Sequence, residues 1–225
     1  MDNFFEDDLI LDGDRILEPK PSISDKALRV NLNKNIYGSF SEIGAGQETA
    51  RHFFRAGAAS RTIAKAMSAY DKQFSDAIYT TEDDGRYVTE NRLHKMLNHE
   101  VKLLDERLDH TENPKRLFFS YANTVATIDF AKKFKGHGWV GIRFQNEPQG
   151  VFNEIILHIQ FKENDVLLQQ RTLGTLGVNL IYGAFYQYHS PKKLIAHLYD
   201  QLDKDQLEID TINFSTKKIN RNINE

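Results

Sequence analysis

The amino-acid sequence predicts a single α/β domain, in which a mixed β-sheet is packed against helices. Some segments alternate between apolar and polar residues, which is typical of strands, and in others apolar residues recur every three or four positions, which is typical of helices. With 225 residues, 40% of them hydrophobic, the chain is long enough for one sizeable core. A strand, a glycine loop and a helix are expected in succession between Leu28 and Ala56.

The overall composition argues against several classes of protein. The chain has 29 basic and 32 acidic residues and a net charge of −3, which gives no electrostatic reason to bind nucleic acid or an anionic membrane. It has no cysteine, which excludes disulfides, thiolate catalysis and cysteine-ligated zinc, and its eight histidines show no metal-ligand spacing. The acidic start lacks a signal-peptide pattern, and no apolar run reaches the roughly 18 residues of a membrane span. We therefore expect a cytoplasmic protein that binds neither nucleic acid nor membranes.

In the first part of the chain, prolines and acidic residues precede the first periodic pattern. Residues 1–25 are expected to form a loosely ordered arm, followed by one domain over residues 26–214. Its first elements are predicted as a strand at Leu28–Tyr37, the glycine loop, and helices at Glu48–Ala56 and Ser60–Tyr70, which Gly57 separates.

In the second part, the helical and strand patterns are clearer. Thr89 is expected to cap a helix from Glu90 to about His110, and Ser190-Pro191 starts another. Gly174 and Gly177 would let a buried helix that begins at Leu167 pack closely. Toward the end of this segment, near Tyr188, a strand is the alternative prediction. The predicted strands are Leu117–Val125, Trp139–Gln145, Glu154–Phe161 and Leu207–Phe214, the second and third forming an antiparallel hairpin, and residues 215–225 form a flexible tail.

The glycine loop is the first candidate binding site. The segment from Ile36 to Gln47 reads I-Y-G-S-F-S-E-I-G-A-G-Q, and small residues before a helix are typical of a phosphate-binding turn. Arg51 and Arg55, one and two turns into the helix, would extend such a site. A tight turn followed by a surface helix with ordinary ion pairs explains the same residues. The expected ligand contacts in the loop are Ser39, Ser41, Gly44, Gly46 and Gln47.

Other polar residues would complete the site. Glu42, the one acid in the loop, is a candidate general base or metal-bound carboxylate. Asp71 and Asp76 are further catalytic candidates, because paired carboxylates could hold Mg²⁺ beside a phosphate. Asn123 is expected at a strand end, and Arg143 on one strand face with Trp139. Helix capping, strand-end hydrogen bonding and sheet-face packing are the structural alternatives for these residues.

These features predict a protein that binds a nucleotide or another phosphate ligand. Such a protein could be a nucleotidyltransferase- or hydrolase-like enzyme that uses the Gly38–Gln47 loop. The loop has no P-loop lysine, and Thr49 replaces the third glycine of a dinucleotide fingerprint. The alternative is a non-catalytic sensing or interaction module that self-associates through the aromatic segment Tyr182–Tyr188 and the Trp139 strand.

The stretch G-S-F-S-E-I-G-A-G-Q resembles the first motif of nicotinate or nicotinamide mononucleotide adenylyltransferases, roughly G-S-F-[DN]-P-x-H-x-G-H. Gly38, Ser39 and Gly46 match that motif, but Gly44 and Gln47 replace its two histidines. Because those histidines stabilise the transferred phosphoryl group, the resemblance implies a related loop shape more than a related activity.

Longer stretches are similar to an uncharacterised bacterial family, some members of which are labelled nucleotide adenylyltransferases. These are I-Y-G-S-F-S-E-I-G-A-G-Q-E-T-A-R-H-F-F-R-A-G and L-G-V-N-L-I-Y-G-A-F. The resemblance implies a cytoplasmic location and supplies no established catalytic residue. Members usually continue further, which implies that this chain is a short version or an N-terminal part.

Overall fold

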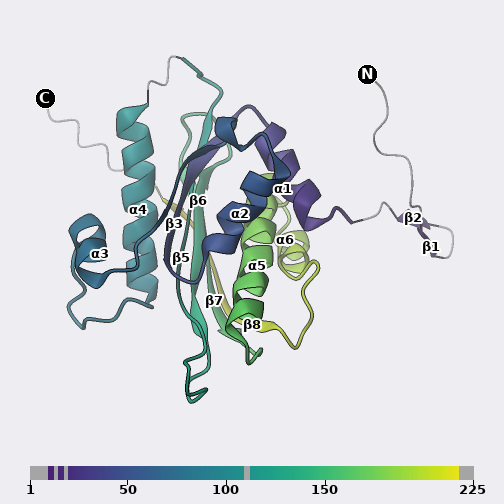
Figure 1. The fold of residues 1–225 in the computed structure, drawn as a ribbon. Helices are drawn as coiled ribbons and strands as arrows, with labels where there is room; N and C mark the ends of the chain where they lie inside the picture. The colour runs from purple at the N-terminus through teal and green to yellow at the C-terminus, as the bar shows by residue number, and fades with distance from the viewer. Residues whose placement is uncertain (1–9, 13–14, 18–19, 109–111, 218–225) are drawn as a thin grey trace, which may run out of the picture.

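A six-stranded mixed sheet lies between two layers of helices in the computed structural model, which describes residues 10–12, 15–17, 20–108 and 112–217 (Figure 1). The strand order is β4-β3-β5-β6-β7-β8, with β3 parallel to β4 and β5 and the rest antiparallel. The predicted single α/β domain with a mixed sheet is therefore confirmed. The strands are β3 (Ile36–Gly44), β4 (Ile63–Ser68), β5 (Leu117–Ala126), β6 (His137–Gln145), β7 (Phe152–Phe161) and β8 (Leu207–Lys217), and β1 (Ile10–Asp12) pairs separately with β2 (Arg15–Leu17).

The helices divide between the two faces of the sheet (Figure 1). One face is covered by α1 (Ile23–Leu32), α2 (Gln47–Ala56), α5 (Val166–Tyr186) and α6 (Pro191–Leu198). The other is covered by α4 (Glu90–Arg107), against which α3 (Lys72–Tyr79) packs. A short 3₁₀ helix, Ala59–Arg61, follows α2.

Strand β7 packs against the helices on both faces of the sheet. Ile155, Leu157 and Ile159 belong to the core under α5, whereas Ile156 belongs to the core under α4. This is the alternation that the sequence predicted, because successive side chains of a strand point to opposite faces.

The strand predicted at Leu28–Tyr37 is wrong in its first half, which lies in α1, and only its last two residues belong to a strand, β3. Ser22 and Asp25 form a capping box that starts this helix. The helix buries Ala27 and Val30 and leaves Leu32 63% exposed. The apolar alternation at residues 28, 30 and 32 was therefore misleading, and the cap was the better signal.

The helix predicted at Ser60–Tyr70 is also wrong, since its main part is strand β4. Ile63, Lys65 and Met67 are partly buried, while the residues between them are exposed. Parallel pairing with β3 decides the conformation, because the strand preference of so short a segment depends on its neighbours.

Most other predicted elements are confirmed. Thr89 caps α4, β6 and β7 form an antiparallel hairpin, and α5 is helical throughout, including its aromatic end. Much of the expected arm, residues 1–25, lies outside the described residues, and α1 already begins at Ile23. Residues 218–225 of the expected tail also lie outside the described residues. No helix within the described ranges is long and apolar enough to cross a membrane.

Candidate functional site

The predicted glycine loop is mostly strand, and its turn is only two residues long. Gly38 to Gly44 lie within β3, and Ala45 and Gly46 connect this strand to α2. Gly44 has φ 91°, and a Cβ there would clash with the carbonyl oxygen of Val125. Gly46 is the N-cap residue of α2, which has no side-chain cap, and a Cβ on Gly46 would clash with the amide of Asn123. The amino end of α2 thus lies directly against the carboxyl end of β5.

Glu42 is a buried titratable group close to this turn. It pairs with Ser68 on β4 and with Asn123 on β5, and Ser68 Oγ donates to Glu42 Oε2 at 3.1 Å. The side chain is buried, and its Oε1 has no hydrogen-bond partner among the described residues. Burial raises the pKa of Glu42 to about 7, with a smaller contribution from nearby Glu48. Near neutral pH this carboxyl group can therefore both donate and accept a proton.

Asn123 lies beside Glu42, and its amide is also unsatisfied. The residue is 0% exposed, and neither Nδ2 nor Oδ1 makes a hydrogen bond of normal geometry within the described part of the chain, although the amide lies close enough to the Tyr121 hydroxyl to act on its pKa. On the same face, the Tyr121 hydroxyl lies 3.2 Å from Thr49 Oγ1 on α2. Burial raises the pKa of Tyr121, which therefore stays protonated. A buried amide without a well-formed hydrogen bond is unusual in a folded protein, because it loses its bonds to water and gains little in return.

Helix α5 packs closely against α2 and against the Tyr121 hydroxyl. A Cβ on Gly177 would lie 2.6 Å from the Tyr121 hydroxyl and would clash with Thr49. A Cβ on Gly174 would lie 2.7 Å from Cβ of Glu48. The predicted role of both glycines in close helix packing is confirmed.

The two serines of the loop point away from Glu42. Because residues alternate along β3, Ser39 and Ser41 lie on the face covered by α4. Ser41 is beside Tyr79, whose hydroxyl donates to Glu100 of α4 at 3.0 Å. A ligand bound at Glu42 would thus be on the opposite side of the sheet from these hydroxyl groups.

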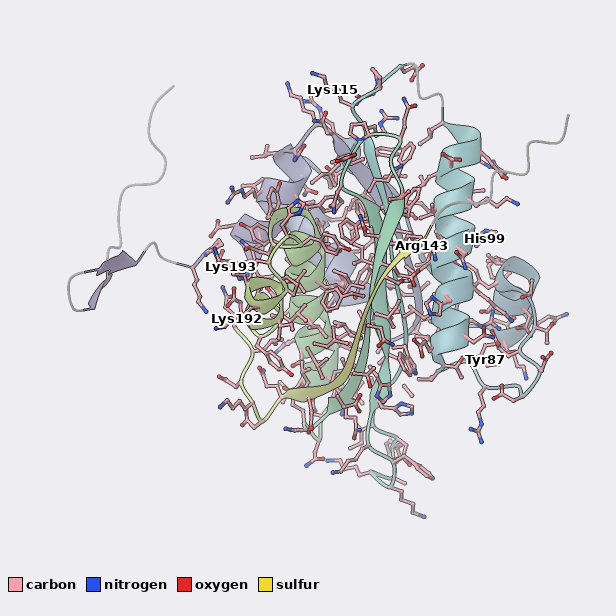
Figure 2. All side chains as sticks on the ribbon, turned by 180° about the vertical axis from the view of Figure 1, so that it is seen from behind. Tyr87, His99, Lys115, Arg143, Lys192 and Lys193 are labelled. Atoms are coloured by element: carbon pink, nitrogen blue, oxygen red, sulfur yellow. The ribbon has the colours of Figure 1, made fainter. Side chains whose placement is uncertain are left out.

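The other acidic candidates and Arg143 take part in structural contacts. Asp71 caps α3 by accepting a hydrogen bond from the amide of Phe74, and Asp76 accepts from Tyr87 and from the buried Arg92. Arg143 lies between the sheet and α4 (Figure 2), where it pairs with Glu154 at 2.6 Å and contacts Asn98. These three candidates therefore do not gather around Glu42. No cluster of three or more His, Asp or Glu residues in the described ranges could hold a metal ion.

The remaining candidates lie along α2. Gln47 donates to the carbonyl oxygen of Gly44 at 2.7 Å and to the hydroxyl of Tyr70 at 3.1 Å, which closes the turn on itself. Arg51 and Arg55 are exposed and pair with Glu48 at 2.8 and 3.4 Å. Both arginines thus make the ordinary surface ion pairs that the structural alternative describes.

One neighbour of the site, Thr49, was not among the site residues predicted from the sequence, whereas Tyr121 and Asn123 were both expected at the end of their strand. Tyr121 lies two residues before Asn123, so strand alternation could have placed both on one face. Thr49 is buried together with Ala50 and Phe53 on one side of α2, and helical spacing could have indicated this.

Substitution of Glu42 should change how stability depends on pH. Its pKa is about 7 in the folded protein and 4.5 ordinarily, so between these values the folded state keeps a proton that the unfolded state releases. The contribution of Glu42 to stability therefore falls as pH rises through this window, by about 3 kcal/mol in total, and is level above it. We expect Glu42→Gln to abolish this fall, as measured by urea unfolding at about pH 5 and about pH 8.

Glu147→Gln, at an exposed position, is the matched control and should keep the pH dependence of the unmodified protein. An equal fall in stability for Glu42→Gln and the unmodified protein would contradict the raised pKa.

No protein-family model and no curated protein sequence matches this chain. Among solved structures, the chain is similar to a competence/damage inducible protein from Agrobacterium tumefaciens, with a TM-score of 0.46, 15% identity, and coverage of 80% of this chain and 99% of that one. It is also similar to a competence-damaged protein (CinA) superfamily protein from Klebsiella pneumoniae, with a TM-score of 0.48, 9% identity, and coverage of 77% and 96%. At such identities and with TM-scores below 0.5, neither similarity carries an argument about function.

Proposed function

We propose that the protein binds a small phosphorylated ligand of the nucleotide class at the carboxyl ends of β3 and β5. The observation that carries this proposal is the completely buried Asn123 amide, in which neither the nitrogen nor the oxygen makes a hydrogen bond of normal geometry, beside the uncapped amino end of α2. The first amides of a helix lack intrahelical partners and favour an anion, and the carboxyl ends of parallel strands are a common location for ligands.

The Asn123 side chain and the backbone amides of the turn would recognise different parts of the ligand. Asn123 offers one donor and one acceptor, which suits a polar group of a base or sugar, while the amides of the turn suit a phosphate. Asn123 is covered by the Ala45–Gly46 turn, so a ligand would enter as this turn moves aside. Glu42 is already connected to the surface, since its hydrogen-bond donor Ser68 is exposed.

Glu42 would also allow chemistry at the site. A carboxyl group with a pKa of about 7 can act as a general acid or base near neutral pH. A transferase- or hydrolase-like reaction on a nucleotide is therefore compatible with the site. Binding of a nucleotide without turnover would instead indicate a sensing protein.

A thermal-shift panel of ATP, nicotinamide mononucleotide and inorganic phosphate tests the binding. We expect at least one nucleotide to raise the melting temperature, by an amount that grows with its concentration, because a ligand that binds only the folded state stabilises it. Asn123→Ala should abolish this rise. Ser39→Ala, a buried substitution on the opposite face of β3, is the matched control and should retain it.

If only inorganic phosphate raises the melting temperature, and Asn123→Ala abolishes that rise, the ligand is phosphate and not a nucleotide. The absence of any rise across the panel, or an unchanged rise in Asn123→Ala, would contradict the proposal.

A further inference from the structure

The connection between β5 and β6 presents two phenylalanines and three lysines to solvent. Phe130 is 106% exposed and Phe134 is 73% exposed, whereas most large apolar side chains of this protein are buried. Lys132, Lys133 and Lys135 are exposed beside them. These five residues are termed the basic aromatic tip. In Figure 1 the connection projects beyond the sheet at the bottom of the view.

Hydrogen bonds at its base hold this loop in a defined shape. The Asp129 carboxylate accepts hydrogen bonds from the amides of Lys133 and Phe134 at 2.7 and 2.9 Å. Gln169, a buried residue of α5, accepts from the amide of Ile128 at 2.8 Å. Lys132 has a positive φ of 53°, a conformation that residues other than glycine seldom adopt. Specific hydrogen bonds therefore hold the loop in a conformation that exposes two apolar side chains to water.

The first turn of α5 adds apolar surface next to the tip. Leu167 is 62% exposed and Leu168 is 44% exposed, and Gln169 of the same helix contacts the base of the loop. Two acids lie near the base of the loop: Glu163 accepts a hydrogen bond from Thr172, and Asp165 caps the amide of Leu168.

We propose that the basic aromatic tip docks on the surface of an anionic lipid bilayer. Exposed phenylalanine and leucine side chains of peripheral proteins insert into the boundary between lipid headgroups and acyl chains, and each lysine near an anionic surface adds attraction of about 1 kcal/mol. The net charge of −3 over the whole chain does not oppose this, because charges act mainly within a Debye length of about 8–10 Å. Within residues 129–135, three lysines accompany one aspartate, whereas Glu163 and Asp165 lie beside the base of the loop, so the excess of positive charge that complements anionic headgroups is confined to the tip itself.

Co-sedimentation of the full chain with vesicles tests this docking. We expect binding to vesicles of phosphatidylcholine mixed with phosphatidylserine, and little binding to phosphatidylcholine alone. Lys132→Ala/Lys133→Ala should weaken the binding about thirty-fold, the equivalent of two such lysines. Lys192→Ala/Lys193→Ala, an exposed pair on α6 (Figure 2), is the matched control and should bind as the unmodified protein does.

A second pair of variants tests the aromatic contribution. Phe130→Ser/Phe134→Ser should lose most of the binding, while Phe74→Ser, at a 57% exposed position on α3, should keep it. Failure of the unmodified protein to bind mixed vesicles would overturn the proposal, as would unchanged binding by the phenylalanine variant. A dimer in sedimentation equilibrium that the phenylalanine variant abolishes would also overturn it, because a second copy would then cover the tip.

Discussion

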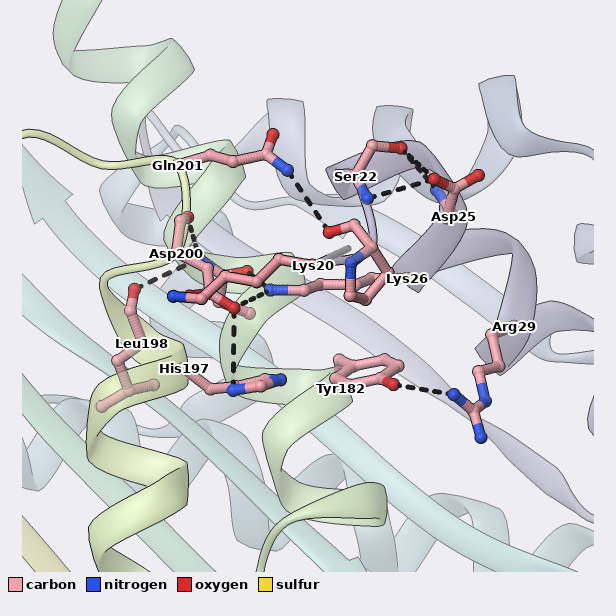
Figure 3. A network of polar contacts seen from close by, with 12 residues as sticks. Lys20, Ser22, Asp25, Lys26, Arg29, Tyr182, His197, Leu198, Asp200 and Gln201 are labelled. Carbon is pink, nitrogen blue, oxygen red and sulfur yellow. Dashed lines mark hydrogen bonds and ion pairs between the residues drawn. The ribbon is translucent and has the colours of Figure 1, made fainter. Parts of the chain in front are cut away.

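Replacement of Asp200 by alanine is expected to lower the free energy of unfolding by about 3–5 kcal/mol, because it leaves a buried charge unpaired. The charge belongs to Lys26 of α1, which is 0% exposed. Its Nζ donates to Asp200 Oδ2 and to Asn179 Oδ1 of α5, both at 2.8 Å (Figure 3). Lys20 also pairs with Asp200, at 2.9 Å, but it is exposed and can turn to solvent.

The pH dependence of the Asp200→Ala variant should identify the cause. Burial lowers the pKa of Lys26, against the raising effect of Asp200. Without Asp200 the pKa of Lys26 should fall further, so the unfolded chain binds a proton that the folded state lacks over a wider window below 10.5. The variant should therefore recover stability, relative to the unmodified protein, as pH rises within that window.

Urea unfolding of matched variants measures these effects. Asp210→Ala removes an exposed carboxylate that is paired with His158 at 2.8 Å, and should cost less than about 1 kcal/mol. Lys26→Met/Asp200→Leu should recover much of the loss, since apolar pairs often replace buried ion pairs without cost. If Asp200→Ala is no more harmful than Asp210→Ala, the buried pair does not hold α1 to the segment that follows α6.

This network illustrates what the sequence could not reveal. Lys26 is 153 residues from Asn179 and 174 residues from Asp200, so no local pattern marks it as a buried residue. The same holds at the candidate site, where Glu42 and Asn123 meet only through the register of two parallel strands. The sequence predicted both as polar residues near a turn, but it could not place Ser39 and Ser41 on the opposite face.

Local signals, in contrast, predicted the elements they govern. The side chain of Thr89 caps the helix that follows it, and the alternation of β7 correctly assigned Ile155 and Leu157 to one face. Strand β4 was missed because it is six residues long and lies at the edge of the sheet, where only its pairing with β3 distinguishes it from a helix. Sequence patterns thus predicted most elements, whereas contacts between distant segments determine the site.

The β3–α2 turn gives the second large expected effect. Gly44→Ala should destabilise the protein by about 3–5 kcal/mol, because it combines an unfavourable positive φ with a clash. Its Cβ would overlap the carbonyl oxygen of Val125, a backbone atom that cannot turn away as a flexible side chain can. The turn or the end of β5 would have to shift.

Gly57→Ala separates the two causes. Gly57 has φ 85°, similar to the 91° of Gly44, but an added Cβ there meets nothing within 4 Å. Its cost should therefore be backbone strain alone, about 1–3 kcal/mol. Thermal or urea unfolding of both variants measures the difference, and equal losses would mean that the turn yields easily at Val125. A turn that yields so easily would also uncover Asn123 at little cost, and in that case ligand access to the site would need no larger rearrangement.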